Sequence, residues 1–141
     1  MAHQLGGERL YKLVAKNDQT RTAPGSTLLG QMLQQAGPCL ILLDEILVYL
    51  LNAGSVQVGE STLKGITLTF LQQLTIAVAN CPHAILIATL TSQITEYMGE
   101  KAEHEYALME KVLGRVEKIR QAVQGTEIYE ERRATHLRHQ R

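Results

Sequence analysis

Two short, uninterrupted apolar runs constrain the fold of this protein more than any other feature of its sequence. The runs are Cys39–Leu43 and Ala84–Ala88, and neither shows the alternation of apolar and polar residues that marks a strand with one solvated face. Each has the length of an ordinary strand, and an unbroken apolar run is typical of a parallel strand covered on both faces. The long segment between the runs leaves room for a helical crossover, so we predict a parallel βαβ unit.

The segment from Glu60 to Asn80 is expected to form the crossover helix. Its central residues, Ile66–Phe70, alternate like a strand, which leaves the local pattern ambiguous. Over the whole segment, however, apolar residues recur at intervals of three and four, and so long a run without a turn signal exceeds an ordinary strand. The residues on this helical stripe are Leu63, Ile66, Phe70, Leu74 and Ala77.

Helical periodicity predicts further elements around the two strands. The expected helices are Leu5–Ala15, a segment from Ser26 to the stop at Gly37-Pro38, and Lys101–Val123, while Ile46–Asn52 is expected to form a short helix or a turn. The Ser26 hydroxyl is expected to cap its helix by accepting a hydrogen bond from a free amide, and a loop is expected through Gly59. Together these elements predict an α/β fold in three layers, with a partial parallel sheet and flanking helices. We expect one domain over residues 1–123 and a polar, basic tail over residues 124–141.

Composition excludes several classes of protein. Fourteen Lys and Arg residues match fourteen Asp and Glu residues, so the net charge of zero creates no global field that attracts nucleic acid or an anionic membrane. Five Tyr, one Phe and no Trp are too few aromatic rings for a surface that stacks single-stranded bases.

No apolar stretch approaches the roughly 20 residues that cross a bilayer, and the N-terminus lacks a signal-peptide core. Cys39 and Cys81 lie far apart in or beside apolar runs, as reduced thiols do. We therefore expect a cytoplasmic protein without a membrane partner.

Two acidic residues, Asp44 and Glu45, follow the first apolar run directly. The carboxyl ends of parallel strands face the ligand crevice of a doubly wound sheet, so acids there are placed to meet a cation or a phosphate. This pattern is that of a Walker B motif, in which Asp44 would hold Mg²⁺ through water and Glu45 would orient the water that attacks the γ-phosphate. The alternative is that the two acids only begin the next helix, where the helix dipole favours negative charge.

Hydroxyl side chains follow the second apolar run at the corresponding position. Thr89, Thr91 and Ser92 lie at its carboxyl end. Because neighbouring parallel strands end at the same edge of a sheet, these hydroxyls are expected beside the acidic pair. The alternative is an ordinary strand exit at which Ser and Thr side chains cap a turn.

The order and spacing of these segments resemble a known family. From about Gln4 to about Arg133, the sequence is similar to the large prokaryotic AAA-type P-loop ATPases. The segments that carry this similarity are Gln4 to Gly7, Ala23 to Gly25, Pro38 to Tyr49, Ile85 to Leu90 and Gly114 to Val116. The resemblance implies the Walker B to sensor 1 region of a P-loop NTPase-like core. It implies catalytic roles for Glu45 and Thr89, nucleotide binding by Asp44 and Thr91, and a metal at Asp44. Members are encoded near restriction-modification and phage-defence genes, which implies an indirect link to DNA.

The phosphate-binding loop of such ATPases has no counterpart in this sequence. That loop needs a Gly-rich turn followed by Lys and Ser or Thr, and none of the eleven glycines here precedes Lys-Ser or Lys-Thr. We therefore expect a fragment, from a truncated gene or a split protein, that is inactive alone and binds ATP and Mg²⁺ only in a completed site. Its expected partners are the missing ATPase segments or a homologous subunit, and self-association is expected through the uncovered strand Ala84–Ala88. The alternative is a non-enzymatic interaction or assembly module that retains the ATPase-like sheet.

Overall fold

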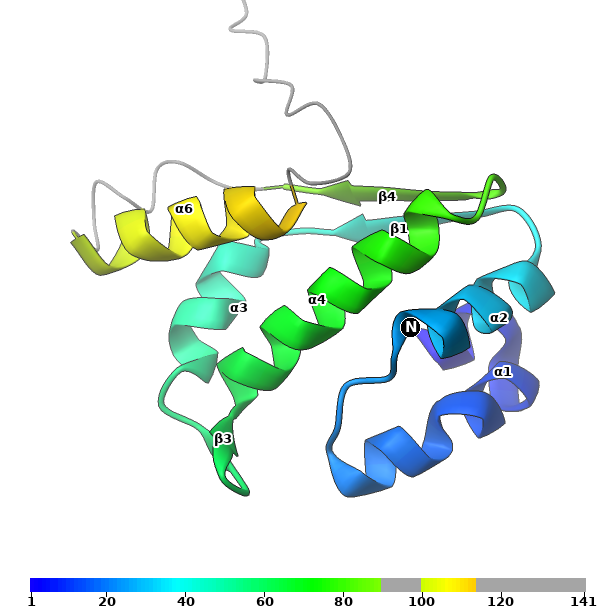
Figure 1. Cartoon of the computed structure of the whole chain (residues 1–141), viewed down its shortest axis with the longest axis horizontal. Coiled ribbons are helices and arrows are strands. Elements are labelled where there is room, and N and C mark those ends of the chain that lie inside the picture. The colour runs from blue at the N-terminus through cyan, green and yellow to red at the C-terminus, as the bar shows by residue number, and fades with distance from the viewer. Residues whose placement is uncertain (90–99, 114–141) are drawn as a thin grey trace, which may run out of the picture.

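The computed structural model describes residues 1–89 and 100–113, and within them it shows a mixed α/β fold with five helices (Figure 1). The elements in sequence order are α1 (Ala2–Thr20), α2 (Ser26–Ala36), β1 (Cys39–Leu43), α3 (Ile46–Ala53), β2 (Gln57–Val58), β3 (Ser61–Thr62), α4 (Leu63–Ala79), β4 (Ala84–Ala88) and α6 (Glu100–Leu113). Both predicted apolar strands and the crossover helix are therefore confirmed. The ambiguous residues Ile66–Phe70 lie within α4, as the longer-range periodicity predicts.

Strands β1 and β4 pair in parallel, as predicted, and their register places both carboxyl ends at one edge of the sheet. Cys39 pairs with Ala84 at the beginning of the ladder, and Leu43 pairs with Ala88 at its end. Helices α3 and α4 separate the two strands in the sequence and allow the backbone to return to the starting edge. The residues that follow β1 and β4 are consequently neighbours in space.

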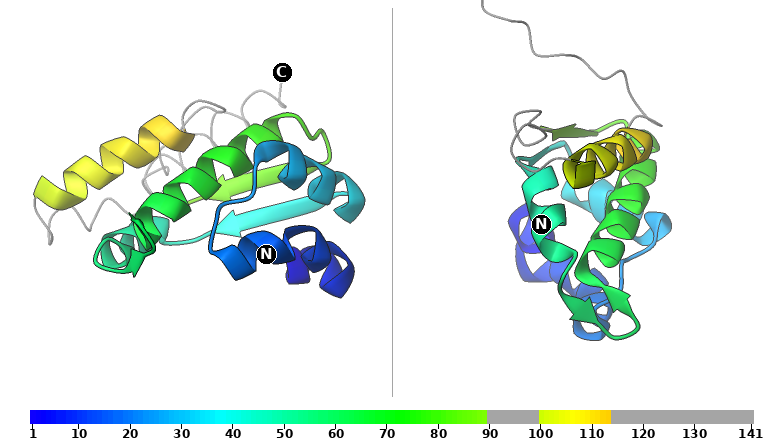
Figure 2. Two further views of the ribbon diagram at one scale, coloured as in Figure 1. Left: turned by 60° about the horizontal axis from the view of Figure 1, so that its bottom comes forward. Right: turned by 90° about the vertical axis from the view of Figure 1, so that its left-hand side faces the viewer.

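Helices cover one face of this sheet in the described part of the protein (Figures 1 and 2). Ile41 faces the helices and is buried, whereas the opposite face exposes four aliphatic side chains by 48% to 65%: Leu40, Leu42, Ile85 and Ile87. The prediction that β1 is covered on both faces is therefore wrong for the described residues, and a third layer is not seen there. An apolar run shows that both faces of a strand are apolar, but it does not show what covers them.

The core lies between the sheet and helices α1, α2 and α4. Its fully buried side chains include Leu10 from α1, Leu29 and Leu33 from α2, and Leu74 from α4. A second cluster of Leu50, Leu71 and Met109 joins α3, α4 and α6. Helix α4 contributes to both clusters, so it holds the sheet and the remaining helices together.

The beginning of α2 differs from the prediction. Gly25 occupies the N-cap position and offers no side-chain oxygen to the free amides, whereas Ser26 is already helical. The Ser26 amide instead donates a hydrogen bond to Oε1 of Gln73 on α4, at 2.9 Å. A glutamine far away in the sequence thus replaces the local cap, which explains why the local pattern was misleading.

Replacing Gln73 with Leu is expected to lower the free energy of unfolding by about 1 kcal/mol, because the part-buried Ser26 amide would lose its acceptor. Urea denaturation followed by circular dichroism measures the change. Gln72→Leu, one position earlier on α4, is the matched control and should unfold near the wild-type midpoint. Equal midpoints for the two variants would show that the Gln73 contact contributes nothing.

Other boundaries also differ from the predictions. Helix α1 extends beyond Leu5–Ala15 at both ends, and Gly6 and Gly7 have non-helical backbone angles that kink it. The expected loop through Gly59 contains β2, whereas its antiparallel partner β3 occupies the beginning of the expected helix Glu60–Asn80, so that α4 begins only at Leu63. Helix α6 overlaps the predicted helix Lys101–Val123, but residues 114–123 lie outside the described residues, as does the proposed basic tail over residues 124–141.

Candidate functional site

The predicted acidic pair and one of the predicted hydroxyl residues meet at the carboxyl edge of the β1–β4 sheet. Asp44 and Glu45 follow β1, and Thr89 follows β4. The Thr89 amide donates to the carbonyl oxygen of Leu43 at 2.9 Å, which extends the contact between the two strands by one hydrogen bond. The expected proximity of these residues is thus present, while their chemical roles stay predictions.

A single hydroxyl group connects both members of the acidic pair. Oγ1 of Thr89 donates a hydrogen bond to Oδ1 of Asp44, and it accepts a hydrogen bond from the amide of Glu45 at 3.1 Å. A threonine hydroxyl has one proton and two lone pairs, so it can make both bonds at once. Thr89 therefore fixes the Asp44 carboxylate and the Glu45 backbone relative to the end of β4.

Glu45 has an unusual backbone conformation. Its φ and ψ angles are 52° and 33°, in the left-handed region that non-glycine residues rarely adopt. Glu45 is also the N-cap of α3, but its carboxylate accepts no capping hydrogen bond. The alternative explanation, that the two acids only begin a helix, agrees with the position of Glu45 at the beginning of α3. It is not supported by a hydrogen bond between the Glu45 carboxylate and the first amides of that helix. Residue type gave no signal of this conformation, because only Gly, Asn and Asp indicate it in a sequence.

The left-handed conformation leads to a prediction about stability. Glu45→Gly is expected to be about 1 kcal/mol more stable than Glu45→Ala, because only glycine relieves the contact between Cβ and the backbone. Thermal or urea unfolding of the two variants measures the difference. The same pair of substitutions at Asp44, which does not have a positive φ, is the control and should show no advantage for glycine. A lack of advantage at Glu45 would contradict the inferred strain.

The acidic pair is open to solvent. A cation bound there would keep part of its hydration shell and would not be enclosed by protein side chains. The side chains of Asp44, Glu45 and Thr89 are all exposed. Within residues 1–89 and 100–113, no group of three or more His, Cys, Asp or Glu side chains could enclose a metal ion. Mg²⁺ commonly keeps several waters and takes only one or two carboxylates together with substrate phosphates. Binding of Mg²⁺ at Asp44 stays a prediction, in which this carboxylate is one donor and water and phosphate supply the others.

Thr91, predicted to bind nucleotide, lies outside the described residues. The same holds for Ser92, the third hydroxyl of the predicted strand exit. Asp44, Glu45 and Thr89 are therefore the predicted site residues that the structure describes.

The two cysteines are free thiols, as the sequence predicts, and the structure places them in packing positions. Cys81 is 2% exposed and belongs to the main core. Burial raises the pKa of the Cys39 thiol above its ordinary value, and the neighbouring Cys81 thiol raises it further. A raised pKa keeps the Cys39 thiol protonated at neutral pH and makes it a poor nucleophile.

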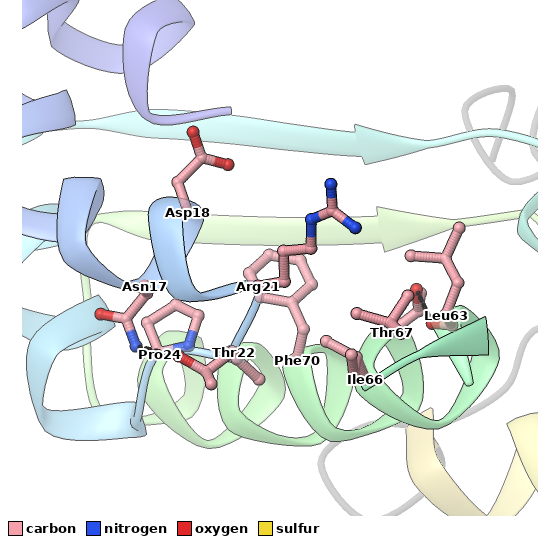
Figure 3. A pocket seen from close by; sticks show the side chains of 11 residues that line it. Asn17, Asp18, Arg21, Thr22, Pro24, Leu63, Ile66, Thr67 and Phe70 are labelled. Atoms are coloured by element: carbon pink, nitrogen blue, oxygen red, sulfur yellow. Dashed lines mark hydrogen bonds between the residues drawn. The ribbon is translucent and has the colours of Figure 1, made fainter. Parts of the chain in front are cut away.

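A separate groove was not predicted from the sequence. It has a volume of about 290 Å³ and lies between the α1–α2 connection and the first half of α4 (Figure 3). Apolar side chains such as Ile66 and Phe70 line one side, and Asp18 and Arg21 contribute charged groups. The Tyr11 hydroxyl donates to Asp18 at 2.8 Å, and this bond raises the pKa of Tyr11. None of the residues that line the groove belongs to the predicted nucleotide site.

Comparison with known protein families gives one match. The DUF499 N-terminal domain matches residues 1–128, a range that contains both strands of the sheet and the Asp44–Glu45–Thr89 site. No curated protein and no solved structure matches the sequence. Of the helices that the structure describes, none combines the length and the apolar character needed to cross a membrane.

Proposed function

The chain belongs to the DUF499 N-terminal domain family, and we propose that it supplies the cation- and water-positioning edge of an ATP-hydrolysis site of the AAA type. The observation that carries the proposal is the double hydrogen bond of Thr89, to the Asp44 carboxylate and from the Glu45 amide. It holds the Asp44 carboxylate and the Glu45 backbone beside the Thr89 hydroxyl, at the carboxyl ends of neighbouring parallel strands. Ligands of open α/β sheets bind at this edge.

Each of the three residues has a distinct role in the proposed reaction. The Asp44 carboxylate would hold Mg²⁺ through water, and the bound ion neutralises charge on the phosphates. The Glu45 carboxylate would accept a hydrogen bond from the attacking water and orient it toward the terminal phosphate. The Thr89 hydroxyl would donate to an oxygen of that phosphate. In the structure the Thr89 hydroxyl is hydrogen-bonded to the Asp44 carboxylate and to the Glu45 amide. Glu45 is also the next residue after Asp44 in the sequence.

The proposed site requires a phosphate-binding loop from elsewhere, because no glycine of this sequence precedes Lys-Ser or Lys-Thr. The test is a Mg²⁺-dependent ATPase assay on the 141-residue protein, alone and with a phosphate-loop polypeptide. That polypeptide is taken from the coding sequence upstream of this one or from another family member. We expect no turnover by the protein alone and Mg²⁺-dependent turnover by the combination.

Two results of this assay would contradict the proposal. Turnover by the protein alone would show that its own residues hold the phosphates by an arrangement different from a P-loop. A combination that neither binds nor hydrolyses ATP would show that the proposed nucleotide site does not form. In an active combination, Glu45→Gln tests the assignment of the water-orienting carboxylate directly.

A second candidate function is a non-enzymatic interaction or assembly module, which the exposed sheet face favours. Leu42 and Ile85 are 65% and 60% exposed there, and among the described strands β4 pairs with β1 alone. An apolar strand with an unpaired edge is a template for pairing with another polypeptide.

If the protein acts in this way, light scattering will show self-association, and Ile85→Lys will abolish it. Ile76→Lys, on the exposed side of α4, is the control and will not abolish it. A monomer at high concentration would exclude self-association through the strand.

A further inference from the structure

We propose that the groove beside the α1–α2 connection binds a small carboxylic acid, with its carboxylate at the Arg21 guanidinium and its apolar body against α4. The groove shares no residue with the proposed nucleotide site, so the inference goes beyond the proposed function. Its volume of about 290 Å³ is near the lower limit for small-molecule pockets, about 300 Å³. A cavity of about half that volume accepts benzene. The groove therefore has room for one aromatic ring and a short acidic substituent.

The side of the groove that α4 forms is apolar. Leu63, Ile66 and Phe70 extend from successive turns of α4 toward the α1–α2 connection (Figure 3). All three are half-buried, so part of their apolar surface is in contact with water. The hydroxyl of Thr67, on the same side, already donates to the Leu63 carbonyl at 2.8 Å and would not lose a partner to an apolar ligand. A ligand that covers this side removes apolar surface from water, which favours binding.

The opposite side of the groove carries a charged donor, Arg21. Its guanidinium makes no hydrogen bond or ion pair with the other residues that the structure describes. The side-chain amide of Asn17 also lines the groove, but it donates to the Thr22 hydroxyl at 3.2 Å. A guanidinium can bind a carboxylate through two parallel hydrogen bonds. Charge complementarity therefore favours a ligand with a carboxylate over a neutral or cationic ligand of the same size.

Asp18 adds a negative charge to the same side of the groove and limits the affinity for an anion. It forms no ion pair with Arg21, and its Oδ2 atom accepts the Tyr11 hydroxyl proton at 2.8 Å. Asp18 therefore leaves the guanidinium free for a ligand, although it repels the ligand's carboxylate. Both side chains are exposed, so water weakens the attraction and the repulsion alike. We consequently expect weak binding that is selective for the acid.

The backbone at Arg21 is unusual for an arginine. Its φ and ψ angles are 52° and 42°, in the left-handed region where glycine commonly ends a helix. The Arg21 amide donates to the Asp18 carbonyl at 3.1 Å, and the Thr22 amide donates to the Asn17 carbonyl at 2.9 Å. These two bonds close the end of α1 and hold Arg21 beside the groove. Because arginine is disfavoured in this conformation, a role of its side chain explains its presence better than helix termination does.

The test is an NMR titration of the 141-residue protein with two probes of nearly equal size, 3-phenylpropanoate and the neutral 3-phenylpropanamide. The acid is expected to bind roughly two- to tenfold more tightly than the amide, the range for one hydrogen-bonded charge at an exposed site. Chemical-shift changes should be confined to amides around the groove, including those of Thr67 and Phe70. Arg21→Gln should remove the preference for the acid. Asp18→Asn keeps an acceptor for the Tyr11 hydroxyl and should increase the preference.

Arg9→Gln is the matched control, because Arg9 also lies on α1 but its guanidinium already donates to Gln35. It should change neither dissociation constant. Arg21→Gly separates binding from stability, because glycine suits the left-handed backbone. This variant should unfold at the wild-type urea midpoint or above it, yet lose the preference for the acid. Equal binding of acid and amide to wild type, or a preference that survives in either Arg21 variant, would overturn the proposal, as would the absence of shift changes around the groove.

Discussion

Glu45→Gln is expected to lower the turnover number of the completed ATPase by about 100-fold or more, while nucleotide binding stays near its wild-type value. A positioned general base typically contributes about 10² to 10⁴ in rate, and glutamine keeps the side-chain volume but cannot take a proton from the attacking water. The Glu45 carboxylate makes no capping hydrogen bond to α3, so the fold should not depend on its charge. Steady-state ATPase kinetics and equilibrium binding of a fluorescent ATP analogue measure the two quantities.

Two further variants make this result specific. Glu60→Gln removes an exposed carboxylate between β2 and β3, outside the site, and should leave turnover unchanged. Asp44→Ala should weaken Mg²⁺-nucleotide binding as well as turnover, because it removes the proposed cation donor. Equal loss of nucleotide binding in Glu45→Gln and Asp44→Ala would show that the roles of the two acids are wrongly assigned.

The sequence predicts the sheet well because its signals are local and strong. Both strands are short apolar runs bounded by Pro38 and Pro82 on one side and by polar residues on the other. The intervening helix α4 repeats its apolar residues over many turns, which separates it from a strand despite the ambiguous centre. Parallel pairing then follows from the length of the connection, and pairing in turn brings Asp44 and Thr89 to one edge.

The features that the sequence does not signal depend on contacts between distant residues. The Glu45 amide and the Thr89 hydroxyl are 44 positions apart, and the Ser26 amide and Gln73 are 47 positions apart. Neither bond has a local pattern, because backbone amides carry no residue identity. The left-handed conformation of Glu45 belongs to the same class, since surrounding contacts rather than residue preference maintain it. The exposure of Leu42 was likewise hidden, because strand composition does not show which layer covers it.

Leu74→Ala is expected to produce the largest loss of stability of any variant proposed for this protein, about 2 to 5 kcal/mol of unfolding free energy. Leu74 is 0% exposed and packs in the core that joins α1, α2 and α4 to the inner face of the sheet. Truncation would leave a cavity that the surrounding side chains can fill only in part, since the neighbouring residues come from separate elements.

Ile76→Ala is the matched control on the same helix, because Ile76 is 40% exposed and a smaller part of its surface leaves water on folding. It should cost about 1 kcal/mol or less, in proportion to the apolar area that it buries. Urea denaturation of both variants tests the difference.

Helix α4 connects the two core clusters, so α3 and the sheet should unfold in a single transition as urea is added to the Leu74→Ala variant. Circular dichroism and hydrogen exchange of the Glu45 amide should then report the same midpoint. Separate transitions for the helices and for the Glu45 amide would show that the acidic pair belongs to a unit that α4 does not stabilise.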